Sequence, residues 1–134
     1  MAIVATGRQR NVGAVPKFLS GEWVDAVDAA LTGTTLPPDL DLTVAHVVDD
    51  VAYVVRVREG RASAKLGTTD DADLVLREDY ATAAALARGE LTAQQAVAEG
   101  RLKLAGAVDV LVDKGPALVA LFDALAAVRA DTSY

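Results

Sequence analysis

The chain has no cysteine, one histidine and few aromatic residues. The lack of cysteine excludes a disulfide framework and a cysteine-ligated zinc site. His46 is the single histidine, so no second imidazole is available for a histidine-rich metal cluster. We therefore expect no metal centre and no cofactor.

Long hydrophobic runs are also missing, since no segment approaches the roughly 20 apolar residues that a bilayer span requires. The N-terminus has no hydrophobic region long enough for a signal peptide. A net charge of −6 argues against nucleic acid as a partner, because release of counterions favours binding by a basic surface. These absences predict a soluble, cytoplasmic protein, and its 134 residues fit one compact domain.

Motifs for catalysis are absent as well. Adjacent aspartates occur at residues 49–50 and 70–71, where turns favour Asp because its side chain hydrogen-bonds nearby backbone amides. No Gly-x-Ser-x-Gly elbow or phosphate-binding loop is present. We expect that the chain alone is not an enzyme.

The remaining sequence alternates between helical and strand patterns. Residues 1–15 show neither pattern and are predicted to form a flexible N-terminal arm, followed by a single domain over 16–134. Apolar residues at helical spacing before Gly33 predict a helix, and residues 34–41, which contain two prolines, predict a linker. Three β-branched segments at 42–48, 51–58 and 61–67 are separated by two-residue turns, which predicts an antiparallel meander.

The second half of the chain adds two strands and several helices. Residues 72–78 predict a fourth strand, and residues 78–89 and 92–100 predict Ala-rich helices that each end in Gly. Residues 101–106 alternate as a fifth strand, 107–112 form a short helix, and 116–130 form a long apolar-faced helix. The predicted fold class is α+β, with a five-stranded, mostly antiparallel sheet and helices packed on one face.

The two-residue turns determine which side chains share a sheet face. Residue 48 then pairs with residue 51, which places His46 and Tyr53 opposite each other on an apolar inner face under the helices. The opposite face collects seven basic residues: Arg56, Arg58, Arg61, Lys65, Arg77, Arg101 and Lys103. These side chains either keep an exposed sheet soluble or make transient contact with an anionic membrane or an acidic partner.

The order of these elements resembles the sterol carrier protein 2 (sterol-binding domain) family, as a bacterial stand-alone member. The most specific match is the G-[KR]-[LI]-K-[LI]-x-G pattern at Gly100 to Gly106, and the resemblance covers about residues 16–128. Families with this fold are similar in enclosing a hydrophobic tunnel between sheet and helices. The resemblance therefore implies that an apolar small molecule, such as a sterol, a fatty acyl chain or a phospholipid tail, is the partner.

The inner face and this resemblance together predict which residues line the ligand site. The predicted ligand-binding residues are Val44, His46, Tyr53, Val55, Ala64, Leu74, Leu104 and Phe122. The His46 and Tyr53 pair either binds a polar head group or forms a mutually satisfied buried pair. Trp23 is interpreted as an anchor between helix and sheet rather than a surface for ligand stacking, and the helix at 117–129 as a movable lid.

Three functions fit the sequence. The first is non-enzymatic binding and carriage of an apolar ligand; the second is an accessory or interaction domain with a filled core, which acts with a partner enzyme; the third is a subunit that adds a pocket wall to an enzyme. The residue types determine neither the ligand nor the oligomeric state, because burial of a methylene contributes about 0.8 kcal/mol whichever molecule carries it.

Overall fold

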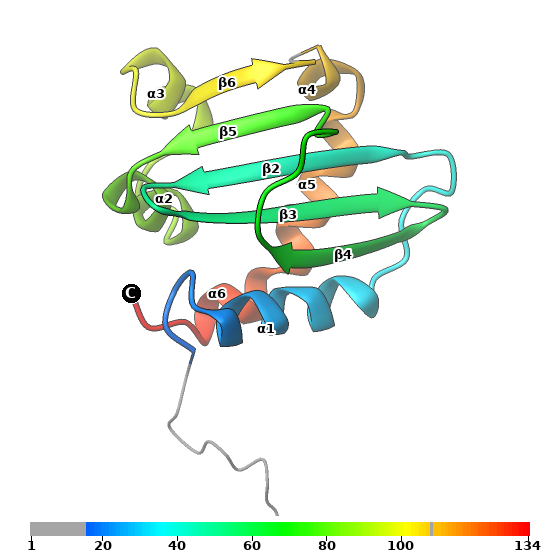
Figure 1. The fold of residues 1–134 in the computed structure, drawn as a ribbon, viewed down its shortest axis with the longest axis horizontal. Helices are drawn as coiled ribbons and strands as arrows, with labels where there is room; N and C mark the ends of the chain where they lie inside the picture. The colour runs from blue at the N-terminus through cyan, green and yellow to red at the C-terminus, as the bar shows by residue number, and fades with distance from the viewer. Residues whose placement is uncertain (1–15, 108) are drawn as a thin grey trace, which may run out of the picture.

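The sheet has five strands in the order β4-β3-β2-β5-β6 (Figure 1). A computed structural model describes residues 16–107 and 109–134, so the expected arm at 1–15 lies outside the described residues. The strands are β2 (Leu42–Val48), β3 (Val51–Arg58), β4 (Arg61–Leu66), β5 (Leu74–Glu78) and β6 (Lys103–Gly106). The β2–β5 pair is parallel and the other three pairs are antiparallel, which confirms the predicted mostly antiparallel sheet.

The strand register follows from the two short turns. Val48 pairs with Val51 across the first turn, and Arg58 pairs with Arg61 across the second. The first turn residue, Asp49, and both residues of the second turn, Glu59 and Gly60, have positive φ values of 52°, 53° and 81°. Such left-handed turns match the twist of the flanking strands, and they place the predicted inner face under the helices.

The helices lie on one face of this sheet (Figure 1). They are α1 (Gly21–Thr32), α2 (Tyr80–Ala87), α3 (Ala93–Ala98), α4 (Val110–Asp113), α5 (Gly115–Ala124) and α6 (Ala126–Ala130). The long helix expected at 116–130 is therefore two helices, because the chain turns at Leu125, where φ is −96° and ψ is 5°. Leu125, at this turn, and Val128, in α6, both line a pocket described below.

Helix α1 packs against the edge strand β4. Ser20 caps the helix, its hydroxyl accepting a hydrogen bond from the Trp23 amide at 3.2 Å. The carboxylate of Asp28 accepts a hydrogen bond from the Ala64 amide at 2.8 Å. This contact satisfies an edge-strand donor that would otherwise be open to pairing with another chain.

The turn from β6 toward α4 depends on a glycine. Gly106 has a φ of 95°, and a Cβ atom at this position would lie 2.4 Å from the Asp73 carbonyl oxygen. That same oxygen accepts a hydrogen bond from the Ala107 amide at 2.7 Å. Only glycine fits this close approach, which explains physically why the Gly100–Gly106 pattern ends in Gly.

Candidate functional site

An apolar pocket of about 570 Å³ lies between the inner sheet face and the helices. This volume falls within the range of roughly 300 to 1,000 Å³ that is typical of small-molecule sites. The apolar lining comes from α1, the sheet, α2 and the C-terminal helices, and includes Trp23, Val27, Val48, Val55, Leu76, Ala83, Leu86, Ala87, Leu125 and Val128.

The mouth of the pocket lies near the connection between α2 and α3. Gly89, Thr92 and Ala93 line the pocket there and are exposed to solvent. Residues at the other end, such as Val27 on α1, are fully buried. The lining is therefore exposed to solvent beside the α2–α3 connection and buried beside α1.

The structure brings three of the predicted site residues together. His46, Tyr53 and Val55 line the pocket. Val44, Ala64 and Leu74 are buried in the hydrophobic core and are not part of the lining. Leu104 is half-buried on β6, also away from the lining, and the side chain of Phe122 in α5 lies outside the described part of the chain.

Sequence reasoning missed two kinds of lining residue. The residues that α2 contributes to the pocket lining were not predicted, because no local sequence pattern shows how an Ala-rich helix packs on a sheet. Glu78 was missed although a signal was present, since it continues the inward alternation of Leu74 and Leu76 along β5. Trp23 does serve as an anchor, with its indole Nε1 donating to Thr132 Oγ1 at 3.2 Å, but it also lines the pocket.

His46 and Tyr53 form a stacked pair on the pocket wall. Their ring centroids lie 4.5 Å apart and the ring planes differ by 2°. Burial lowers the pKa of His46 to about 4, and burial followed by the charge of Glu78 raises the pKa of Tyr53. Both rings are therefore neutral near pH 7. Within the described residues, neither ring makes a side-chain hydrogen bond, so the polar atoms of the pair are not satisfied by each other.

Glu78 is the acidic residue of the pocket lining. Burial, and then the charge of Asp79, raises the pKa of Glu78 to about 7. Among the described residues, its Oε2 atom is the one buried side-chain nitrogen or oxygen without a hydrogen-bond partner. A carboxylate oxygen in such surroundings is costly unless a donor reaches it.

Aromatic residues close the pocket beside α1. The centroid of the Phe18 ring lies 5.0 Å from the ring centroid of Trp23, 5.5 Å from that of Tyr80 and 4.9 Å from that of Tyr134. The backbone adds two hydrogen bonds between the C-terminal tail and the start of the described chain, from the Phe18 amide to the Ser133 carbonyl and from the Ser133 amide to the Pro16 carbonyl. The C-terminal tail is thus fixed to the segment that precedes α1.

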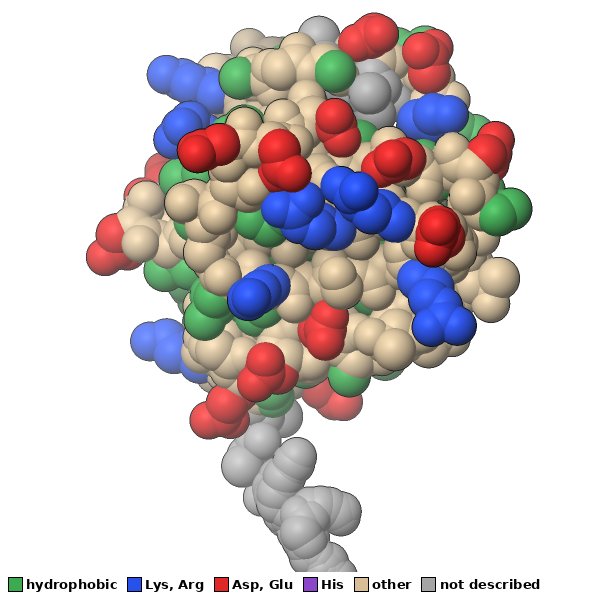
Figure 2. All heavy atoms as spheres, turned by 45° about the vertical axis from the view of Figure 1, so that its right-hand side comes forward, with side chains coloured by type: hydrophobic (Ala, Val, Ile, Leu, Met, Phe, Trp, Pro, Cys, Tyr) green, Lys and Arg blue, Asp and Glu red, His purple; other side chains and the backbone are tan. Residues whose placement is uncertain are grey.

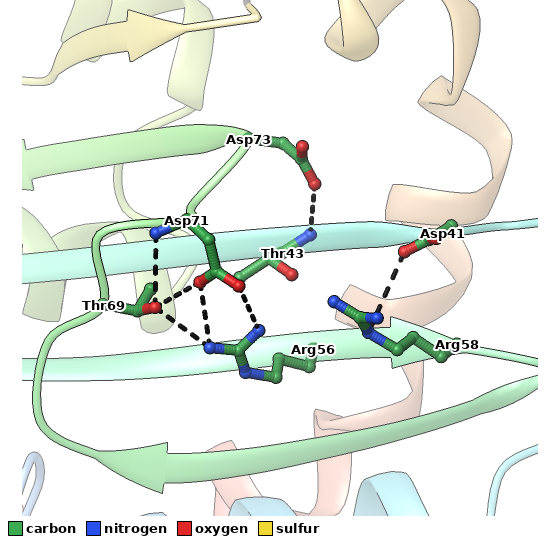
Figure 3. Close-up of polar contacts among 7 residues, drawn as sticks. All are labelled: Asp41, Thr43, Arg56, Arg58, Thr69, Asp71 and Asp73. Carbon is green, nitrogen blue, oxygen red and sulfur yellow. Dashed lines mark hydrogen bonds and ion pairs between the residues drawn. The ribbon is translucent and has the colours of Figure 1, made fainter.

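Residues 67–73 cross the outer face of the sheet, and Arg56 is tied to this loop (Figure 3). Its guanidinium makes a bidentate contact with the Asp71 carboxylate at 3.0 and 3.2 Å, and hydrogen bonding from Arg56 lowers the pKa of Asp71 to about 2. Arg58 lies 4.0 Å from Asp41, and Arg101 lies 3.6 Å from Glu99. The strand register places six of the seven basic residues on the outer face. Arg101 precedes β6, and its Nε donates to Thr82 Oγ1 of α2 at 3.2 Å. Three of the seven residues are paired with acids.

The surface view agrees with this pairing. Figure 2 shows Lys and Arg side chains interspersed with Asp and Glu side chains over the face that it presents. A face of mixed charge attracts anionic lipid less strongly than seven unpaired cations would. Membrane contact therefore stays a prediction.

The turn residue Asp49 and the N-cap residue Asp79 have structural roles at the start of α2. The Asp49 carboxylate accepts a hydrogen bond from the Tyr80 amide at 2.9 Å, and the Asp79 carboxylate accepts one from the Thr82 amide at 2.8 Å. Both contacts cap the first turn of α2. Over residues 16–107 and 109–134, no three His, Cys, Asp or Glu side chains gather where they could hold a metal ion, and no helix is long and apolar enough to cross a membrane.

Comparison with solved structures supports the fold. A conserved protein of Thermus thermophilus, TT1886, is similar with a TM-score of 0.68 and 23% identity, over 84% of this chain and 90% of that one. A crystal structure of sterol carrier protein 2 gives a TM-score of 0.66 and 22% identity, over 82% and 98% of the two chains. The palmitated SCP2L2 of Aedes aegypti gives 0.51 and 18%, over 75% and 86%.

Sequence comparison gives the family. No curated protein matched the chain. The family described as the SCP-2 sterol transfer family matches residues 25–113, which include most of α1, the whole sheet and the turn at Gly106. Because this match covers well over half of the 134 residues, the chain belongs to the SCP-2 sterol transfer family.

Proposed function

We propose that the protein binds an apolar small molecule, such as a sterol, a fatty acyl chain or a phospholipid tail, and carries it without chemical change. The observation that carries this proposal is the pocket of about 570 Å³, which is lined mostly by apolar side chains and includes solvent-exposed residues of the α2–α3 connection. In this proposal the pocket is the binding part of the hydrophobic tunnel that the family resemblance implies.

Two further observations support a carrier over an accessory domain with a filled core. An apolar pocket of this size is large compared with the few small voids of ordinary protein interiors, so it fits a ligand-binding site better than a filled core. A relative with the same fold is described as palmitated, which agrees with an acyl chain as one ligand class.

Ligand binding can be tested with 1-dodecanol as the probe and Trp23 as the reporter. Trp23 is the single tryptophan and lines the pocket, so its emission should shift as the alkyl chain displaces water around the indole. Ala87→Phe fills the pocket from α2 and should abolish the shift. Ala29→Phe, at an exposed position of α1, is the matched control and should leave it unchanged.

The outcomes separate the candidate functions. Saturable binding by the wild type and by Ala29→Phe, but not by Ala87→Phe, supports a carrier site at this pocket. If the wild type shows no saturable response to 1-dodecanol, the pocket does not bind alkyl chains and the carrier proposal is wrong.

A further inference from the structure

The pocket has a polar end built around Glu78. This residue ends β5, pairs with Val48 of β2, and shares its sheet face with Leu76, so its side chain extends on the side covered by the helices. It lines the apolar pocket and also a second hollow, whose lining includes the outer-face residues Val47, Arg77 and Lys103. Glu78 therefore marks one end of the apolar volume.

The unsatisfied Glu78 oxygen indicates which kind of ligand head group this end of the pocket can bind. Oε2 is buried and has no hydrogen-bond partner among the described residues. The oxygens of an ionised carboxylate accept hydrogen bonds and cannot donate them. The Glu78 carboxylate, which lines the pocket, thus has accepting capacity that no described residue uses, and a ligand group with an O–H or N–H donor can pair with this carboxylate. A second carboxylate would instead add a negative charge beside the first in surroundings of low polarity, which is strongly unfavourable.

Tyr53 supplies the complementary half of this recognition. It lines the same pocket, where its ring stacks on His46 of β2. Burial, and then the charge of Glu78, raises the pKa of Tyr53. Within the described chain, the Tyr53 hydroxyl makes no hydrogen bond, and a phenol can both donate and accept. A ligand alcohol therefore has a hydrogen-bond acceptor in the Glu78 carboxylate and a donor in the Tyr53 phenol, both on the lining of this pocket.

We propose that Glu78, assisted by Tyr53, selects ligands whose polar head donates a hydrogen bond and carries no negative charge. This inference rests on the proposed carrier function and specifies the ligand class: neutral alcohols or amides with a long apolar body are bound in preference to ionised fatty acids. Glu78 is thus a specificity-determining residue that acts by accepting a hydrogen bond and repelling an anion.

Other charged groups near Glu78 or on the pocket lining define the alternative, in which a cation binds the head group of the ligand. Asp79 lies beside Glu78 and raises its pKa, and Arg77, Arg101 and Lys103 line the outer hollow together with Asp49. Arg129 of α6 also lines the apolar pocket. If a cation at the wall controls recognition of the head group, carboxylate ligands will be preferred instead.

The test compares 1-dodecanol with dodecanoate at pH 8.5, where both Glu78 and the fatty acid are ionised. Trp23 emission reports binding of both probes, which differ only in the head group. We expect the wild type to bind 1-dodecanol roughly tenfold or more tighter than dodecanoate, because a like-charge contact costs at least one factor of ten in affinity.

Two variants and a control assign the preference to these residues. Glu78→Gln keeps the size of the side chain and removes its charge, so dodecanoate binding should strengthen several-fold and the preference should shrink. Tyr53→Phe should weaken binding of 1-dodecanol, because it removes the donor to the alcohol oxygen. Glu22→Gln removes the same charge from an exposed position in α1 and should preserve the wild-type ratio.

The outcomes distinguish this inference from the carrier function. If the wild type binds dodecanoate as tightly as 1-dodecanol, or if Glu78→Gln leaves the ratio unchanged while circular dichroism shows a folded protein, the selectivity inference is wrong and the carrier function stands. If neither probe binds to the wild type or to any variant, the carrier function itself is wrong.

Discussion

The unpaired carboxylate of Glu78 should make the stability of the protein depend on pH, and Glu78→Gln should remove that dependence. Burial raises the pKa of Glu78 from about 4.5 to about 7 in the folded protein. The folded state then holds this proton more tightly than the unfolded state. The free energy of unfolding therefore falls as pH rises from about 4.5 to about 7. Above that window, the titration of Glu78 no longer changes the free energy of unfolding.

The size of the effect follows from the pKa change. A tenfold change in proton affinity corresponds to about 1.4 kcal/mol. The rise in the pKa of Glu78 from about 4.5 to about 7 would therefore lower the free energy of unfolding by about 3 kcal/mol at high pH if the carboxylate were fully shielded from solvent. Glu78 keeps part of its side chain in contact with solvent, and solvent screening reduces the expected cost to about 1 to 2 kcal/mol. Glu78→Gln should therefore be more stable than the wild type by about that amount at pH 8, and nearly equal to it at pH 5.

The variant and the wild type must be compared at each pH because His46 opposes Glu78. Burial lowers the pKa of His46 from 6.5 to about 4, so the unfolded state binds that proton more tightly and stability rises with pH over this range. Both proteins contain His46, and its effect cancels in their difference. Urea denaturation at pH 5, 6, 7 and 8, with Glu22→Gln as the control, gives the required differences. A difference between Glu78→Gln and the wild type that is the same at all four pH values would refute the reasoning.

Four further predictions test other parts of the structure. Ala64→Trp should destabilise the protein by about 1 to 3 kcal/mol in urea denaturation, because Ala64 lies in the packed core and not in the pocket; unchanged stability would show spare volume there. Gly106→Ala should cost about 3 kcal/mol or more, since its Cβ would collide with the Asp73 carbonyl; a folded variant of wild-type stability would contradict that contact. Amides of α5 should exchange with solvent faster than those of β3 and slow when 1-dodecanol is added, because α5 can open without breaking the sheet; equal and unchanged protection would exclude a lid. Arg61→Glu with Lys103→Glu should leave co-sedimentation with anionic vesicles unchanged if the outer face is only a solvated surface, and a large loss of binding would show that this face contacts membranes.

The sheet could be predicted from the sequence because its signals are local. Two-residue turns at Asp49-Asp50 and Glu59-Gly60 fix the register of β2, β3 and β4, and alternation then assigns every side chain to a face. The same logic placed His46 opposite Tyr53 on the inner face, as observed. The loop across the outer face was not predicted, because the contact of Arg56 with Asp71 joins residues whose pairing depends on the path of the chain.

The pocket was harder to predict than the sheet. Alternation along a strand identifies the inner face but not the part of that face that the helices leave uncovered, so Val44 and Leu74 could not be distinguished from Val55. The depth of the pocket depends on how α2 docks and on the turn at Leu125, neither of which has a local sequence signal. Glu78 had such a signal, since an acidic residue at an inward position of a strand is costly and therefore informative.

The central claim is that the pocket holds an apolar ligand, and native mass spectrometry of the protein purified from its own host tests it most directly. We predict that the wild type carries a bound lipid-like molecule that is released on collisional activation, whereas Ala87→Phe, purified in the same way, carries none. A wild-type protein that is free of ligand after purification, and that remains free after incubation with 1-dodecanol, would contradict the claim.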